Sequence, residues 1–393
     1  MRRALAAVAA ALALVACDRA PDGPPTWAAD VAPIVYGNCA QCHRPGGPGP
    51  FTLLSYDDAV ERVDRIRRAV SAERMPPWLP SHETVALAGE RRLSDADKAT
   101  LLAWIDAEAP RGDPGVEPSP PTWPSGWGLG EPDLVLSMDE SYAVPAEGAD
   151  HFRNFVLPIA VDGPRYVRAV ELRPGSPEVV HHATMQVDPT PSSRIADAAD
   201  PLPGYDEMFT RSMAAPPGGF FLGWTPGRTP TPFPEGMAWR VEPGTDFVVQ
   251  LHLRPTGEPV SVDVEVGFWF TDEPPTRMPV IVRLGGQAMD IPPGEAHYPV
   301  VDSIRLPVGV QAIGAFPHAH YLGRTMRVWA ETPEGDEVVL MDIPRWDFNW
   351  QDAYRYAEPV DLPAGTLLRL DYVFDNSADN ELNPFDPPRR VVY

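Results

Sequence analysis

Two cysteines and a histidine stand together near the N-terminus, in the run Cys39-Ala40-Gln41-Cys42-His43. Thiols at this spacing can form thioethers with the two vinyl groups of one haem, and the histidine that follows can bind its iron. Half of a zinc site is the alternative, but a thiolate zinc site needs a second cysteine pair, and the chain has only three cysteines. The sequence therefore predicts a covalently bound c-type haem on Cys39 and Cys42, with His43 as an axial ligand.

A second axial ligand is expected from a later loop. Met75 is followed by Pro76 and Pro77, which end any helix and keep the backbone extended. A thioether suits haem iron that already has a histidine ligand and raises its potential. We therefore predict Met75 as the second ligand. His82 is the rival ligand, and burial of Met75 in a core is the alternative role.

Five further histidines occur in three settings: His181-His182, His252, and His318-Ala319-His320. On a strand, His318 and His320 would project from one face and could chelate one ion. His181 and His182 would face opposite sides of a regular strand, so a shared metal requires a bulge there. His252 alone would most often be a solvated side chain. Imidazole ligands suit copper, zinc, iron or nickel, and the spacing does not select among them.

The N-terminus has the pattern of an export signal. Arg2 and Arg3 precede an apolar run from Ala4 to Ala16, which is too short to span a bilayer. The run ends in Leu14-Val15-Ala16-Cys17, which resembles the lipobox of bacterial lipoproteins. The resemblance implies a protein of the bacterial cell envelope, lipid-anchored through Cys17 on the periplasmic side or at the cell surface. An ordinary cleaved signal with a stray cysteine is the alternative.

The net charge and the small number of cysteines limit which partners and which covalent cross-links can be expected. The net charge of −23 is spread along the chain and argues against a nucleic-acid partner, which would need a basic surface. With one cysteine assigned to a lipid and two to a haem, no disulfide is expected. Membrane contact is expected through the lipid anchor only.

The pattern of apolar residues predicts a multidomain chain. Ser55 with Asp58 and Ser94 with Asp97 predict helix starts in a small all-α cytochrome c domain. Short apolar runs predict all-β antiparallel domains after a proline-rich linker. The expected boundaries are 1–17 for the signal and lipobox, 26–110 for the cytochrome domain, 111–132 for the linker, and 133–278 and 279–393 for two β domains.

The chain after about residue 130 resembles the copper type II, ascorbate-dependent monooxygenases, the family of the peptidylglycine and dopamine β-monooxygenases. The matching pieces occur in family order: 180–183 (Val-His-His-Ala), 223–227 (Gly-Trp-Thr-Pro-Gly), 234–236 (Pro-Glu-Gly), 250–252 (Gln-Leu-His) and 318–323 (His-Ala-His-Tyr-Leu-Gly).

This resemblance implies two jelly-roll-like sandwich domains with one copper each. One copper would be held by His181, His182 and His252. The other, which binds O2, would be held by the catalytic pair His318 and His320 with a methionine. The arginine that holds the substrate carboxylate in the peptidylglycine enzymes corresponds to Phe316 here, so a more apolar small organic substrate is expected.

The methionine ligand of the family would lie just beyond Tyr393. We expect that the given sequence ends before the strand that carries this methionine. The alternative is that Met326 or, further away, Met341 completes the site.

The leading hypothesis is a copper-dependent monooxygenase that hydroxylates an sp3 C–H bond with O2. Its electrons would come from ascorbate or a redox protein through the bound haem. One alternative is a haem–copper electron-transfer or copper-binding envelope protein without oxygenase activity. A zinc-binding β protein beside a cytochrome is another.

Overall fold

The computed structural model of the chain describes residues 23–123, 126–207, 212–285 and 288–392. The expected signal segment and Cys17 lie outside these residues. No described helix combines the length and the apolar character that crossing a membrane requires.

The N-terminal region contains short helices around a small core. Ser55 and Ser94 cap two of them, since their hydroxyl oxygens accept the backbone N–H of Asp58 and Asp97, which confirms both predicted helix starts. Trp27 and Trp104 are fully buried and anchor the core. The elements are a π-helical turn (Trp27–Val31), α1 (Ala32–Asn38), α2 (Tyr56–Glu61), α3 (Val63–Ser71) and α4 (Asp95–Asp106).

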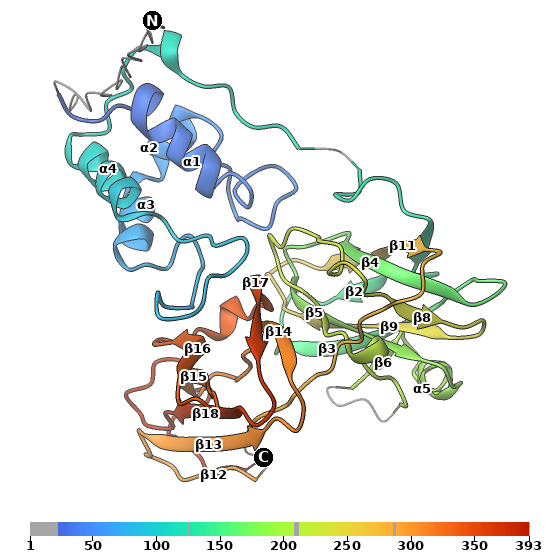
Figure 1. Cartoon of the computed structure of the whole chain (residues 1–393). Coiled ribbons are helices and arrows are strands. Elements are labelled where there is room, and N and C mark those ends of the chain that lie inside the picture. Colours follow the sequence, from blue (N-terminus) through green and yellow to red (C-terminus); the bar gives the residue numbers. More distant parts are fainter. Residues whose placement is uncertain (1–22, 124–125, 208–211, 286–287, 393) are drawn as a thin grey trace, which may run out of the picture.

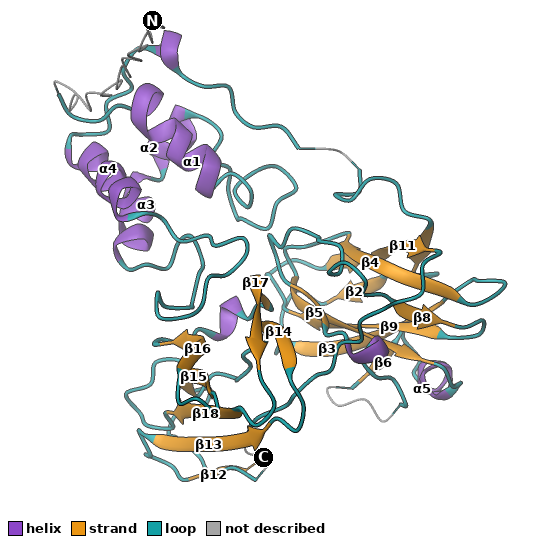
Figure 2. Cartoon of the chain, viewed as in Figure 1, coloured by secondary structure: helices purple, strands orange, loops and turns teal. Residues whose placement is uncertain are grey.

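The prediction of a small all-α cytochrome c domain ahead of two jelly-roll-like sandwiches is wrong. Strands dominate the described residues, which form six sheets of two to five strands, whereas helices are few, short and mostly N-terminal (Figure 2).

The N-terminal region also does not close on itself as an all-α unit. Residues 74–93 leave the helices and lie on the last β region. There Val85 N–H donates to the Val339 carbonyl over 3.0 Å, and the buried Leu87 pairs with Tyr356. The packing of residues 74–93 on the last β region could not be predicted from the sequence, because a segment added to the edge of a sheet has no periodic pattern of its own.

The middle β region is built from two main sheets. The four-stranded sheet has the order β1-β11-β4-β8, and the five-stranded sheet has the order β6-β3-β9-β5-β7. Both contribute to one large apolar core. The elements are β1 (Leu134–Ser137), β2 (Tyr142–Val144), β3 (His151–Pro158), β4 (Arg165–Pro174), β5 (Val180–Asp188), α5 (Ser192–Ala199), β6 (Tyr205–Asp206), β7 (Leu222–Trp224), β8 (Trp239–Val241), β9 (Asp246–Leu253), β10 (Val260–Val262) and β11 (Val264–Thr271).

The last β region has a separate core, and its main sheet has the order β13-β18-β15-β16. Strand β14 pairs with β17 beside it, and both lie next to the middle region (Figure 1). The elements are β12 (Asp290–Ile291), β13 (Tyr298–Arg305), β14 (Val310–Ala315), β15 (Gly323–Glu331), β16 (Glu337–Ile343), a 3-10 turn (Phe348–Trp350), β17 (Tyr354–Leu362), β18 (Leu367–Phe374) and β19 (Val391–Val392).

Candidate metal centre

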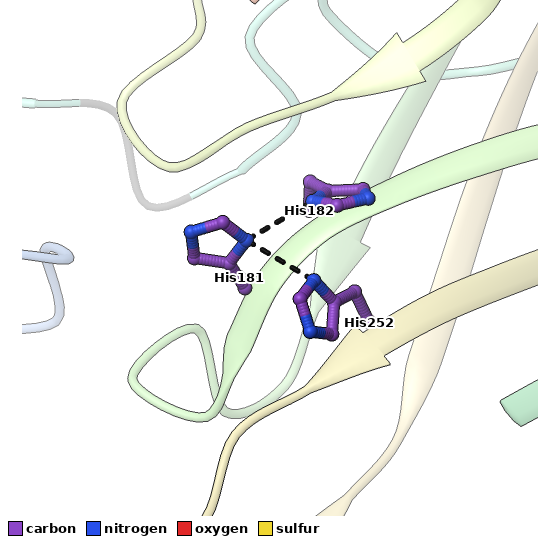
Figure 3. A group of neighbouring side chains, drawn as sticks. All are labelled: His181, His182 and His252. Atoms are coloured by element: carbon purple, nitrogen blue, oxygen red, sulfur yellow. Dashed lines mark hydrogen bonds between the residues drawn. The ribbon is translucent and has the colours of Figure 1, made fainter. Parts of the chain in front are cut away.

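Three histidines from two neighbouring strands of the middle region converge on one point. His181 and His182 come from β5 and His252 from β9 (Figure 3). The Nδ1 atom of His181 lies 3.0 Å from Nδ1 of His182 and 3.2 Å from Nδ1 of His252. Among the described residues, this is the group of histidine, cysteine or carboxylate ligands whose spacing suits one metal ion.

An irregularity in β5 makes the arrangement possible. In the β5–β9 ladder, His182 lies opposite His252, and the register shifts between Val180 and His182. The extra residue lets two consecutive side chains reach the same side of the strand. This confirms the bulge that a shared metal required.

Burial keeps these imidazoles neutral. The pKa of His182 is lowered to about 2, by burial first and then by the neighbouring histidines. Burial also lowers the pKa of His252 to about 4, although the Asp150 carboxylate acts in the opposite direction. At neutral pH the rings therefore have the uncharged form that a metal ligand needs.

Asp150 orients His252 from outside the cluster. Its Oδ2 lies 3.2 Å from Nε2 of His252, so the Nε2–H group can donate a hydrogen bond to the carboxylate. The lone pair of Nδ1 then faces the other rings. A carboxylate behind a ligating imidazole fixes the tautomer in this way in metal sites. His252 itself is 2% exposed, contrary to the solvated role that its strand position alone would suggest. The sequence did not single out Asp150.

The donor set fits a soft or borderline cation better than a hydrogen-bonded core. Nδ1 of His181 faces two other nitrogens, whereas a neutral ring has a single proton, so hydrogen bonds cannot satisfy the whole triad. The spacings also suit a metal, since nitrogens bound tetrahedrally at 2.0–2.1 Å from one ion lie roughly 3.3 Å apart. Copper and zinc both accept three imidazoles.

The second histidine pair lies in a loop and not on a strand, the setting in which the two side chains were expected to share one face. His318 and His320 follow β14, and Ala319 between them is buried. Their ring centroids are still 5.2 Å apart, at an interplanar angle of 81°. Both histidine side chains are exposed to solvent. Two imidazoles form an incomplete ligand set for copper.

The candidate methionines for this pair are core residues. Met326 on β15 and Met341 on β16 are fully buried in the core of the last β region. Their burial gives both a packing role, and ligation by either stays an untested alternative.

Phe348 lies between the two histidine groups. Its ring stacks on His181 with centroids 5.2 Å apart, and it lies 5.8 Å from the ring of His252. On the other side it lies 5.7 Å from the ring of His320. Phe348 is buried and belongs to the last β region. One aromatic side chain therefore contacts both groups, a role that an isolated phenylalanine in the sequence does not reveal.

A shallow hollow lies beside His182, on the side of β5 and β7. Its lining is mostly apolar and includes His182, Phe221, Trp224, Phe316 and Gln351. Phe221 and Phe316 stack with centroids 4.1 Å apart.

The Cys39–His43 segment follows α1 and fits a covalently bound haem. Both thiols are free, and burial raises the pKa of Cys39 to about 12. Nδ1 of His43 lies 3.0 Å from the Phe51 carbonyl oxygen. If Nδ1 donates a hydrogen bond to this carbonyl, the ring proton is on Nδ1 and the lone pair of Nε2 is free to bind iron. The loop packs tightly on this ring, since a Cβ at Gly49 would lie 2.7 Å from Nδ1.

Met75 lies in the loop after α3 and is half-buried. The alternative ligand His82 is exposed. Its neighbour Ser81 is hydrogen-bonded to β16, since Ser81 N–H donates to the Asp342 carbonyl over 2.7 Å. The assignment of the second axial ligand stays a prediction.

Comparison with known proteins adds little. No protein-family description matches the chain, and no curated protein matches it. Among solved structures, a candidate alpha-L-fucosidase from Bacteroides ovatus is similar over 77% of this chain and 43% of its own length, with 9% identity and a TM-score of 0.15. This chain thus spans less than half of that protein, and a TM-score this low shows neither fold nor function.

Proposed function

We propose that this chain is a copper-dependent monooxygenase that hydroxylates an sp3 C–H bond of a small apolar substrate with O2. The observation that supports this most is the convergence of three neutral imidazoles, with Nδ1 separations of 3.0 and 3.2 Å. A second histidine pair lies across a single phenylalanine ring from them. A site for electron storage and a site for oxygen chemistry would thus be neighbours.

Bound copper would supply one-electron redox chemistry and oxygen activation, and a haem on Cys39 and Cys42 would supply electrons one at a time. The chain contributes position and environment. Asp150 holds the tautomer of His252, and Phe348 covers the face of His181 and meets His320 edge-on. The stacked rings of Phe221 and Phe316, which line the hollow beside His182, would offer an apolar surface to such a substrate.

Location and donor are part of the same proposal. Cys17 would anchor the protein in a bacterial envelope, and ascorbate or a redox protein would reduce the haem. O2 and the organic substrate would be the other partners.

A haem–copper electron carrier without oxygenase activity is the second candidate. The incomplete His318–His320 pair favours it, since two imidazoles in a loop bind copper more weakly than three on strands. Substrate-dependent O2 uptake separates the two functions. Oxidation of reductant with no hydroxylated product across a panel of apolar substrates would support the carrier.

Metal analysis and EPR test the metal assignment directly. Copper titration should give one tight and one weak site, and His252→Ala should remove the tight site without loss of haem. His297→Ala is a matched control because His297 is exposed and lies in the last β region. Tightly bound zinc with no Cu(II) EPR signal would contradict the proposal, as would loss of haem in the His252 variant.

A further inference from the structure

The haem-binding segment lies against a loop of the middle β region. A Cβ atom placed on Gly227 would lie 2.6 Å from Sγ of Cys42 and 3.8 Å from Nη1 of Arg91. Gly227 also has a φ of +81°, which side chains other than glycine rarely adopt. The loop that follows β7 therefore approaches Cys42 as closely as a backbone can.

Asp352 joins the three regions of the chain at this contact. Its Oδ2 accepts from Nη2 of Arg91, in the N-terminal region, over 2.8 Å. Its Oδ1 accepts from the hydroxyl of Thr225 over 3.3 Å and lies 3.9 Å from Nη1 of Arg228, both in the loop after β7. The Asp352 side chain is 13% exposed, so these interactions are less screened than those of a surface pair.

The same loop leads directly to the three-histidine cluster. Gly227 is three residues beyond Trp224, the last residue of β7. In the ladder, Trp224 pairs with Ala183 of β5, the neighbour of His182. A short path of covalent and hydrogen bonds thus connects the contact at Cys42 with one ligand of the cluster.

We propose that the Arg91–Asp352 pair docks the haem segment on residues 224–228 and that electrons enter the three-histidine site through this contact. The inference rests on the haem and copper of the proposed function. One electron moves, so that ferrous haem becomes ferric while cupric ion becomes cuprous, and no bond or proton need change. Arg91 and Asp352 are positioning residues, since neither is a ligand of the haem or of the copper.

Anaerobic electron transfer in the full-length protein, loaded with haem and copper and without substrate, tests the proposal. The haem is reduced rapidly, and its reoxidation is followed together with loss of the Cu(II) EPR signal. Arg91→Gln and Asp352→Asn should each slow the transfer at least tenfold at unchanged haem and copper content. The double variant should be no slower than either single variant, because the two side chains act as one unit.

Glu83→Gln is the matched control. Glu83 pairs with Arg327 over 2.7 Å and also ties the N-terminal region to the last β region, but its partner does not contact Cys42 or Gly227. Its transfer rate should stay within twofold of that of the unaltered protein. A rate slowed as much as in Asp352→Asn would show a general loosening and overturn the specific role.

A second readout does not depend on copper. In the copper-free haem protein, amide hydrogen exchange of residues 224–228 should become faster in Asp352→Asn and stay unchanged in Glu83→Gln. Unchanged exchange and unchanged transfer in both Arg91→Gln and Asp352→Asn would overturn the proposal, as would absence of transfer in the unaltered protein. Failure to hydroxylate any substrate would leave this result standing, because no oxygenation step is measured.

Discussion

The ring of Phe348 stacks on that of His181 at an interplanar angle of 23°, although the two residues belong to different β regions. The same ring lies 4.3 Å from Tyr321, next to the second histidine pair. A side chain in this position determines how close the two histidine groups can come and how much water reaches them.

Phe348→Ala should therefore weaken both stability and copper binding. Removal of a buried phenylalanine side chain typically costs about 3–5 kcal/mol of unfolding free energy. Loss of the stacked ring also frees His181 to rotate, so the tight copper should bind at least tenfold more weakly. Chemical denaturation and chelator competition measure the two effects. Phe348→Leu should recover most of the stability, and equal copper affinity in the alanine variant would contradict the role.

Asp150→Asn should weaken copper binding without removing a ligand. The carboxylate that faces Nε2 of His252 becomes an amide, which can present its NH2 group and favour the wrong tautomer. Loss of such an outer partner typically reduces metal affinity about 10–100-fold. Chelator competition measures the affinity, and Asp139→Asn, at an exposed carboxylate, is the control. An unchanged affinity would show that Asp150 does not orient His252.

Acid should destabilise the strand behind the cluster through Asp200. Arg153 on β3 donates to both of its carboxylate oxygens, over 3.0 and 2.8 Å, and these hydrogen bonds lower the pKa of Asp200 to about 2. A lowered carboxyl pKa gives stability that is present above about pH 4 and lost as the pH falls towards 2.

Asp200→Asn should thus be less stable than the unaltered protein at pH 6, and the difference should shrink between pH 4 and pH 2. Denaturation curves at several pH values measure this, with Asp206→Asn as the exposed control. A difference that is constant with pH would contradict the ion-pair explanation.

Met75→Ala should change the haem and leave the copper site intact. Loss of an iron–thioether bond should lower the reduction potential and abolish the weak red absorption of that bond. Spectra and redox titration measure both, and His82→Ala is the control. An unchanged spectrum in Met75→Ala together with a changed one in His82→Ala would transfer the assignment to His82.

Local patterns predicted much of the β structure. The apolar runs at 166–172, 178–187, 245–254, 325–330, 337–343 and 366–375 coincide with strands, because alternation reports which face is buried. The run at 280–284 is not a strand, and β3, β13 and β17 were not predicted. Their sequences mix charged and apolar residues, so their pairing depends on neighbours that lie far along the chain.

The site was predictable only where consecutive residues define it. Cys39 to His43 and the histidine motifs are visible as spacings, and the required bulge at His182 followed from strand geometry. Asp150, Phe348 and Asp352 are single residues whose roles arise from tertiary contacts. The loop position of His318 and His320 could not be chosen from the sequence, because a spacing of two fits a strand as well as an extended loop. The stretch 188–244 is rich in proline and glycine and shows no long apolar run, so its α5 and three short strands could not be predicted from pattern.

The segment at residues 74–93 has a consequence for the order in which the protein matures. Thr84 receives a hydrogen bond from Asp342, 258 residues further along the chain, and loop closure over such a distance is slow. A chain that crosses a membrane N-terminus first must therefore wait for its last strands before this segment can settle. In a protein that is exported and carries a haem as proposed, the Arg91–Asp352 pair would also form only after residue 352 has arrived, so the Cys42 thiol would be open to haem attachment before the loop at Gly227 is fixed on it. Under the proposed function, attachment would then precede closure.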